Sequence, residues 1–214
     1  MIDQNWQALT ERCNMRIFLA GVSCVGKSAI GARLAELLRI RFFDLDVETE
    51  RFFGISIENL RNRHLTSHGF RLAVSQVLQH VLSREDSCHC VIALPPSGLL
   101  SALWKVISKT RDATTVVLSD TPENILRRIT FYDVESRPLQ KKLTDHEKGL
   151  YLREIKSDIA YYNRSFRRAN VTVDINNCGL EEASRKVWDV LKSIPSNDRG
   201  DVQEPCTAMM HARG

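Results

Sequence analysis

A glycine-rich run of eight residues constrains this chain more than any other stretch. Gly21-Val22-Ser23-Cys24-Val25-Gly26-Lys27-Ser28 fits the phosphate-binding pattern G-x-x-x-x-G-K-[ST] at every fixed position. In this pattern the two glycines let the backbone turn tightly, so that successive N–H groups point inward at a phosphate. The lysine adds positive charge for the β- and γ-phosphates, and the serine offers its hydroxyl to Mg²⁺.

The flanking residues give this loop the surroundings that phosphate binding requires. Residues 16–20 form a short apolar run typical of a buried strand, and residues 29–38 carry apolar side chains at helical spacing. The loop would therefore lead into a helix N-terminus, where the helix dipole also favours phosphate. We predict that the chain binds a nucleoside triphosphate and Mg²⁺, rather than carrying a loop without a ligand. The expected nucleotide-binding residues are Gly21, Ser23, Cys24, Val25, Gly26, Lys27, Ser28 and Ala29.

The composition indicates a folded protein of one α/β domain. Its 214 residues are 43% hydrophobic and 26% charged, which is enough to bury a core. The net charge of +4 suits polyphosphate but is too small to indicate nucleic-acid binding. The N-terminus lacks the pattern of a signal peptide, and no apolar run reaches membrane-spanning length. We therefore expect a cytoplasmic protein that binds neither nucleic acid nor membrane.

The six cysteines are scattered and include no C-x-x-C pair. Thiols without a disulfide framework fit a reducing compartment. Cys88-His89-Cys90 admits a metal-binding interpretation, but it opens an expected strand and no second ligand pair follows at zinc spacing. We interpret these cysteines as buried thiols.

Strand and helix patterns alternate along residues 15–194, which predicts a parallel sheet wound on both faces with the ligand at the carboxyl ends of its strands. We expect residues 1–14 to form an N-terminal arm with a short helix, and residues 195–214 a disordered tail. The polar residues 131–146 are expected to be a mobile excursion. Expected strands are 16–20, 42–46, 89–94, 114–118 and 170–174. Expected helices are 29–38, 47–53, 56–63, 70–82, 99–108, 121–130, 147–168 and 180–194.

Five stretches in this order resemble shikimate kinase, a compact P-loop kinase, over roughly residues 16–191. The resemblance implies an α/β P-loop NTPase fold: a three-layer sandwich with a five-stranded parallel sheet. It also implies a substrate-binding region after the second strand, and a lid, here about residues 131–146, that closes over ATP. The stretches are the phosphate loop, Phe43-Asp44-Leu45-Asp46, Phe53-Gly54-Ile55-Ser56-Ile57, Phe70-Arg71, and Ser136-Arg137-Pro138-Leu139 after Arg127-Arg128.

Asp44 and Asp46 end the expected second strand with Leu45 between them, so their carboxylates would share one face. No acid ends the strand at residues 90–94, where many P-loop proteins keep a Mg²⁺ aspartate. Asp44 is therefore the candidate to support Mg²⁺ with Ser28, as in the family. Asp46 would orient or deprotonate the attacking hydroxyl. The alternative is a pair of solvated acids at a strand end.

The resemblance assigns three arginines. Arg71 matches an arginine that the family uses on the substrate carboxylate, although a solvated surface arginine is the alternative. Arg137 would descend with the lid onto the transferring phosphoryl group, where positive charge stabilises the transition state. Arg128 matches a family position near the adenine.

Three departures from the family pattern fall on the substrate side. A glycine triplet of the family is Pro95-Pro96-Ser97 here, and proline offers no N–H to a substrate. A glutamate after the Phe-Arg pair is Val74, and a second carboxylate-binding arginine aligns with Asp158. An acid at that place repels a carboxylate.

These features predict an ATP-dependent kinase, expected to be a monomer, that phosphorylates a hydroxyl of a small metabolite. Its expected catalytic residues are Lys27, Asp46 and Arg137, and its expected substrate-binding residues are Asp46, Arg71 and Arg137. The acceptor is shikimate or, given the departures, a different hydroxylated metabolite. A nucleotide-binding regulatory protein without kinase activity is the remaining alternative. A GTPase is disfavoured, because no Asn-Lys-x-Asp motif occurs.

Overall fold

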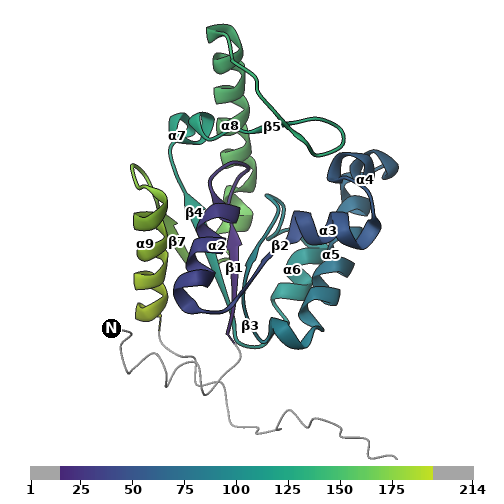
Figure 1. Ribbon diagram of the computed structural model, residues 1–214, viewed down its shortest axis with the longest axis vertical. Coiled ribbons are helices and arrows are strands. Elements are labelled where there is room, and N and C mark those ends of the chain that lie inside the picture. Colours follow the sequence, from purple (N-terminus) through teal and green to yellow (C-terminus); the bar gives the residue numbers. More distant parts are fainter. Residues whose placement is uncertain (1–14, 195–214) are drawn as a thin grey trace, which may run out of the picture.

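The computed structural model describes residues 15–194 (Figure 1). The expected N-terminal arm, residues 1–14, and the expected tail, residues 195–214, lie outside the described residues. Every adjacent pair of strands in the main sheet is parallel, and the strand order is β2-β3-β1-β4-β7. The expected five-stranded parallel sheet is therefore confirmed. Its strands are β1 (Met15–Ala20), β2 (Arg41–Asp44), β3 (His89–Ala93), β4 (Ala113–Ser119) and β7 (Val171–Asp174).

Two hydrophobic cores lie on opposite faces of this sheet, because alternate residues of a strand point to opposite sides. In β1, Ile17 and Leu19 enter one core, whereas Phe18 and Ala20 enter the other. The first core is covered by α2 (Lys27–Leu38) and α9 (Leu180–Ser193). The second is covered by α5 (Ser67–Leu82) and α6 (Ser101–Ile107). Figure 1 shows the resulting three layers.

Several helices begin where the sequence indicates. α4 (Ile57–Arg63) has the expected cap, since the Ser56 hydroxyl accepts a hydrogen bond from Asn59 N at 3.3 Å. α7 (Pro122–Arg127) starts with proline in its first turn, after Thr121.

Other boundaries differ from the expected ones for local reasons. β2 ends at Asp44, not at residue 46, because the Asp44 side chain caps α3 (Leu45–Phe53). α5 starts at Ser67, inside the expected loop, because the Thr66 hydroxyl accepts from Gly69 N. α8 (Asp145–Phe166) starts inside the expected excursion, where Thr144 and Glu147 form a capping box.

The remainder of that excursion contains a short antiparallel hairpin, β5 (Phe131–Tyr132) and β6 (Pro138–Leu139). We call residues 131–139 the lid hairpin. A 3₁₀ turn at Glu85–Ser87 precedes β3. No helix within residues 15–194 is long and apolar enough to cross a bilayer.

Candidate active site

The phosphate-binding loop, residues 21–28, connects β1 to α2 at the carboxyl end of the sheet. Gly21 has a φ of +142°, and a Cβ added there would lie 2.8 Å from the Leu118 carbonyl oxygen. Gly26 has a φ of +110° and forms the left-handed cap of α2. A side chain at either position would strain the loop, so the two glycines have the backbone role that the motif predicts.

Lys27 is buried in this loop, with 9% of its surface exposed. Its ammonium group donates to the carbonyl oxygens of Val22 at 2.8 Å and Gly21 at 3.1 Å. Burial lowers the pKa of Lys27 to about 8, although the negative charges of Asp46, Cys24 and Asp44 oppose this. The ammonium group is therefore held against two carbonyl oxygens of the phosphate-binding loop.

Ser28 and Asp44 come together at the start of α2 and the end of β2. The Ser28 hydroxyl donates to Asp44 Oδ2 at 2.5 Å. The other carboxylate oxygen of Asp44 accepts from the backbone N of Asp46 at 3.0 Å. Two oxygen donors held side by side suit Mg²⁺, a hard cation that prefers oxygen ligands. The expected pairing of Ser28 with Asp44 therefore has a geometric basis in this fold.

Asp46 lies in the first turn of α3, so the expectation that Asp44 and Asp46 share a strand face is wrong. The chain turns into a helix because the Asp44 side chain caps it. Asp46 nevertheless stays near Lys27, whose charge acts on it. Burial and the Asp44 carboxylate raise the pKa of Asp46 to about 6, while Lys27 and Arg61 pull it down. A carboxylate with this pKa is suited to accept a proton near neutral pH.

Arg71 lies in the second turn of α5, and its Nε is buried without a hydrogen-bond partner. Val74, one turn further along, is fully buried and offers no acceptor. Arg71 is half-buried, and a guanidinium with one buried, unsatisfied N–H is suited to an anionic ligand.

Arg61 of α4 is a second cation in this region that the sequence interpretation missed. Its guanidinium lies 5.3 Å from the centroid of the Phe70 ring, next to Arg71 in the chain. Its charge also acts on Asp46 and on Tyr162 of α8. No local pattern marks this arginine, because its position depends on how α4 packs against α5.

The residues that depart from the family pattern also have defined positions in the structure. Asp158 is exposed on α8, and partial desolvation of its carboxylate and the charge of Glu154 raise its pKa. Tyr162, one turn further along, has its pKa raised by burial and by Asp158, while Arg71 and Arg61 lower it. Asp158, Arg71 and Arg61 are therefore all near enough to Tyr162 to influence its pKa. After β3, the backbone N of Gly98 donates to the Pro95 carbonyl at 2.8 Å, so the segment Pro95-Pro96-Ser97 is a closed turn.

Arg128 follows α7 and contacts the phosphate-binding loop. Its Nη1 donates to Asp120 Oδ2 at 2.5 Å and to the Val25 carbonyl at 3.4 Å. The Asp120 side chain is fully buried and accepts from Thr121 N at 2.7 Å and Asn124 Nδ2 at 2.6 Å. Burial raises the pKa of Asp120, but hydrogen bonds from Asn124 and Arg128 lower it more. Asp120, which the sequence interpretation missed, thus holds Arg128 against the loop.

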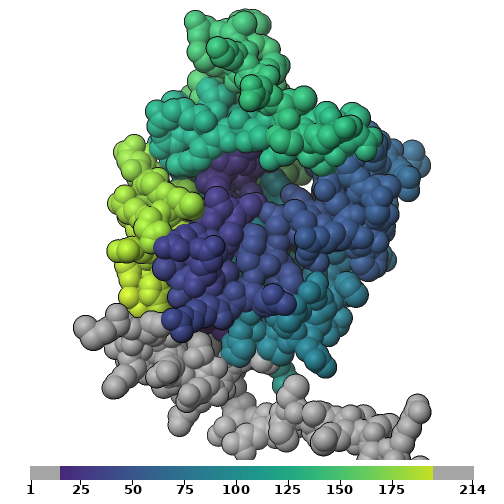
Figure 2. Space-filling view, in the orientation of Figure 1, coloured from purple at the N-terminus to yellow at the C-terminus, as the bar shows by residue number. Residues whose placement is uncertain are grey.

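Arg137 lies in the lid hairpin with its side chain 72% exposed. Its Nε pairs with Asp133 Oδ2 at 3.2 Å, and its backbone N donates to Asp133 Oδ1 at 2.9 Å. Figure 2 shows the green lid segment arching over the purple phosphate-binding loop towards the blue α3–α4 region, with an opening beneath it. Within residues 15–194, no hydrogen bond or ion pair joins Arg137 to Asp46, so its role at the phosphoryl group stays a prediction.

The cysteines and histidine of the 88–90 segment lie at the start of β3, away from these residues. Burial raises the pKa of Cys90 to about 12, which makes it an unreactive thiol. In the part of the chain that the structure describes, no group of three or more His, Cys, Asp and Glu side chains could hold a metal ion.

Comparison with known proteins gives one consistent result. The family model for shikimate kinase matches residues 23–192. A shikimate kinase of Aquifex aeolicus is 31% identical over 87% of this chain and 99% of its own length. A Thermus thermophilus shikimate kinase is 29% identical over 82% of this chain and 89% of its own length.

Solved structures agree with these relatives. The crystal structure of the Aquifex aeolicus shikimate kinase has a TM-score of 0.62 and 27% identity, covering 83% of this chain and 96% of that one. The shikimate kinase from Acinetobacter baumannii in complex with shikimate has a TM-score of 0.67 and 25% identity. It covers 88% of this chain and 97% of that one.

Proposed function

The chain belongs to the shikimate kinase family, a family of ATP-dependent kinases, and we propose that it transfers the γ-phosphoryl group of Mg-ATP to a hydroxyl of shikimate. The observation that carries this proposal is the joining of Ser28 to Asp44 by a 2.5 Å hydrogen bond, with Asp46 in the next turn of chain. This arrangement supports a site in which the groups for nucleotide and acceptor would lie side by side.

On the nucleotide side, the loop amides and Lys27 bind the phosphate chain. Ser28 and Asp44 would hold Mg²⁺, which neutralises negative charge on the phosphates. Arg128, fixed by Asp120, contacts the loop from the side where we place the adenine.

On the acceptor side, Asp46 accepts the proton of the attacking hydroxyl as the new O–P bond forms. Its pKa of about 6 leaves it mostly ionised at pH 7 and ready to act as the base. The unpartnered Nε of Arg71 supports binding of the acceptor carboxylate, with the charge of Arg61 nearby. Arg137 would stabilise the negative charge of the transferring phosphoryl group once its side chain leaves Asp133 and contacts that group.

Asp158 favours a second candidate acceptor, a hydroxylated metabolite without a carboxylate. Asp158 and Arg71 both lie near enough to Tyr162 to act on its pKa, which Asp158 raises and Arg71 lowers. The negative charge of Asp158 weakens carboxylate binding, whereas its carboxylate can accept a hydrogen bond from a hydroxyl group.

The two acceptors are distinguished by comparing shikimate with an analogue whose carboxylate is replaced by an uncharged amide. Each is incubated with the full chain and Mg-ATP, and products are identified by mass. We expect shikimate to gain one phosphoryl group and to have a kcat/KM at least tenfold above the analogue, the effect of one charge-assisted contact. Equal or better use of the analogue would favour the second candidate.

A further inference from the structure

The lid hairpin is docked on α3 and α4 through three hydrogen bonds made by two of its residues. The Val134 carbonyl accepts from the Ser56 hydroxyl at 2.6 Å and from Asn59 Nδ2 at 3.4 Å. The Ser136 hydroxyl donates to Glu50 Oε1 at 2.5 Å. Figure 1 shows the hairpin extending from α7 and α8 across to this side of the molecule. The lid is therefore held by residues far from it in the sequence.

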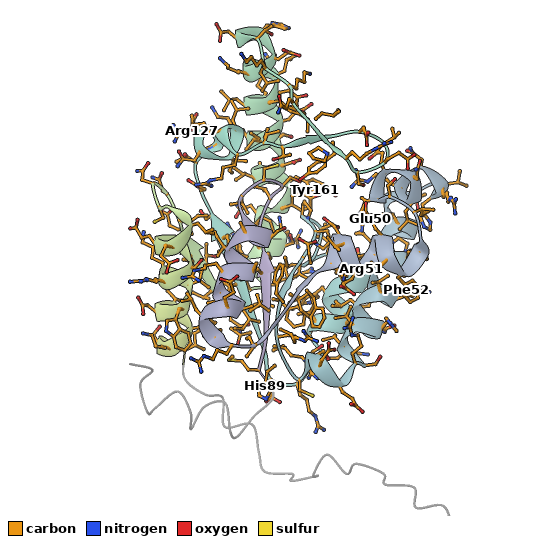
Figure 3. All side chains as sticks on the ribbon, viewed as in Figure 1. Glu50, Arg51, Phe52, His89, Arg127 and Tyr161 are labelled. Carbon is orange, nitrogen blue, oxygen red and sulfur yellow. The ribbon has the colours of Figure 1, made fainter. Side chains whose placement is uncertain are left out.

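Glu50 is the central residue of this docking. The same Oε1 atom also accepts from the backbone N of Ile57 at 2.8 Å, at the start of α4. In Figure 3, Glu50 lies on the lid side of α3, whereas Arg51 and Phe52 lie further from the lid. Glu48, two residues earlier, pairs instead with Arg51 at 2.7 Å and with Arg84 at 3.2 Å. Glu50 is thus the acid of α3 that meets the lid.

The lid presents Ser136 to Glu50 in a fixed conformation. Ser136 has a φ of +60°, a left-handed conformation that is uncommon outside glycine. Asp133 maintains it, because its carbonyl accepts from Ser136 N at 3.0 Å and its side chain accepts from Arg137 N at 2.9 Å. Asp133 joins Ser136 and Arg137 into one turn. When Glu50 holds the Ser136 hydroxyl, the backbone of Arg137 is therefore fixed as well.

The same helix carries the proposed base. Asp46 and Glu50 are one turn apart on α3, and the charge of Glu50 acts on Asp46. We propose that Glu50 is a positioning residue for phosphoryl transfer: it accepts the Ser136 hydroxyl when the lid is down and so places Arg137 relative to the Asp46 side of the site. The catalytic role of Glu50 rests on the proposed function, whereas the docking of the lid hairpin on α3 does not.

The test uses the full chain and removes the lid side chain of the contact between Ser136 and Glu50. Ser136→Ala deletes the hydroxyl without touching α3 or α4. Glu50→Gln keeps an acceptor oxygen for Ile57 N and Ser136 but removes the charge, and the double variant measures the coupling. Glu135→Gln is the matched control, because it changes the neighbouring lid residue, which is exposed and whose side chain makes no hydrogen bond or ion pair within residues 15–194.

Two readouts are compared. The first is amide hydrogen exchange of residues 133–137 with Mg²⁺ and a non-hydrolysable ATP analogue, which needs no phosphorylation of any acceptor. The second is kcat and KM for ATP and shikimate.

We expect Ser136→Ala to speed exchange of the lid amides about tenfold and to lower kcat about tenfold, the effect of losing one charge-assisted hydrogen bond. We expect a smaller effect of Glu50→Gln, and a double variant no worse than Ser136→Ala. The KM for shikimate should change less than twofold.

Lid exchange in Ser136→Ala equal to that in Glu135→Gln would overturn the docking of the lid hairpin through Ser136 and Glu50. Faster exchange with an unchanged kcat would overturn the positioning role of Glu50. Failure of the wild-type chain to phosphorylate shikimate would count against the proposed function, and the exchange measurement would still decide whether Ser136 and Glu50 dock the lid hairpin.

Discussion

Ser28 at the start of α2 is joined to Asp44 at the end of β2 by a 2.5 Å hydrogen bond between side chains. The contact fixes the first turn of the phosphate-binding helix against the strand that leads to Asp46. Asp44 has a second function in the fold, because its other oxygen caps α3. The proposed metal site and the position of the proposed base therefore depend on the same carboxylate.

Asp44→Asn should separate these two functions. Asparagine is as good an N-cap as aspartate, so the midpoint of thermal unfolding should change little. Loss of the negative charge should raise the Mg²⁺ concentration for half-maximal activity by about tenfold or more, because anionic oxygens hold this cation. A Mg²⁺ titration at fixed ATP measures the effect, with Asp189→Asn on the surface of α9 as control. An unchanged Mg²⁺ requirement would exclude Asp44 from the metal site.

Asp46→Asn should inactivate the protein and stabilise it. Loss of a general base costs about 10²–10⁴ in rate. The pKa of Asp46 is raised from 3.8 to about 6, so between these values the unfolded chain ionises while the folded protein keeps its proton. Stability therefore falls as pH rises through this window, and the full penalty remains at pH 7. Removing it should stabilise the protein by up to about 3 kcal/mol, measured by denaturant unfolding. Lower stability of the variant at pH 7 would contradict this assignment.

The activity should depend on pH through two groups. kcat/KM for the acceptor should rise as Asp46 loses its proton near pH 6, and kcat/KM for ATP should fall as Lys27 loses its own above about pH 8. Bound phosphates favour the charged lysine, so the fall in kcat should occur at higher pH. Initial rates between pH 5 and 9.5 give both profiles. An acidic limb that persists in the residual activity of Asp46→Asn would assign that limb to another group.

Arg71→Met should impair acceptor binding without weakening the fold. We expect the KM for shikimate to rise about 10- to 100-fold, the effect of losing a charge-assisted contact, while the KM for ATP changes less than twofold. The unfolding midpoint should not fall, because Arg71 Nε has no partner in the free protein. Arg63→Met, at the exposed end of α4, is the matched control. Equal effects on the KM values for ATP and shikimate would remove Arg71 from the acceptor site.

Asp158→Asn should improve the use of shikimate. Removing a carboxylate from the acceptor side lowers repulsion of the substrate, but the residue is exposed, so we expect only a two- to fivefold fall in KM, about the size that screened charges produce. The analogue without a carboxylate serves as the control, because its KM should not fall. A higher KM for shikimate in this variant would mean that Asp158 itself holds the acceptor.

The features that sequence predicts well here are local. The phosphate-binding loop, the apolar strands and the caps at Ser56 and Thr121 each depend on neighbouring residues. The expected strand at Asp46 failed because a side-chain cap at Asp44 competes with strand extension, and the spacing of apolar residues does not show this. The monomeric state stays a prediction.

Glu50, Arg61 and Asp120 were missed for a different reason. The contact between Glu50 and Ser136 joins residues 86 apart in the chain. Arg61 acquires its place from helix packing, and Asp120 from a buried network with Arg128 and Asn124. Neither the type of these residues nor the local sequence around them marks them as functional, and only the tertiary structure shows their partners.

The most direct test of the proposed function is ADP release by the purified chain with Mg-ATP, measured with and without shikimate and repeated with Asp46→Asn. We predict release that requires shikimate and that falls at least 100-fold in the variant, as expected for loss of a general base. Tight binding of ATP without shikimate-dependent ADP release would contradict shikimate as the acceptor. Shikimate-dependent release that survives in Asp46→Asn would contradict the role of Asp46 in the reaction.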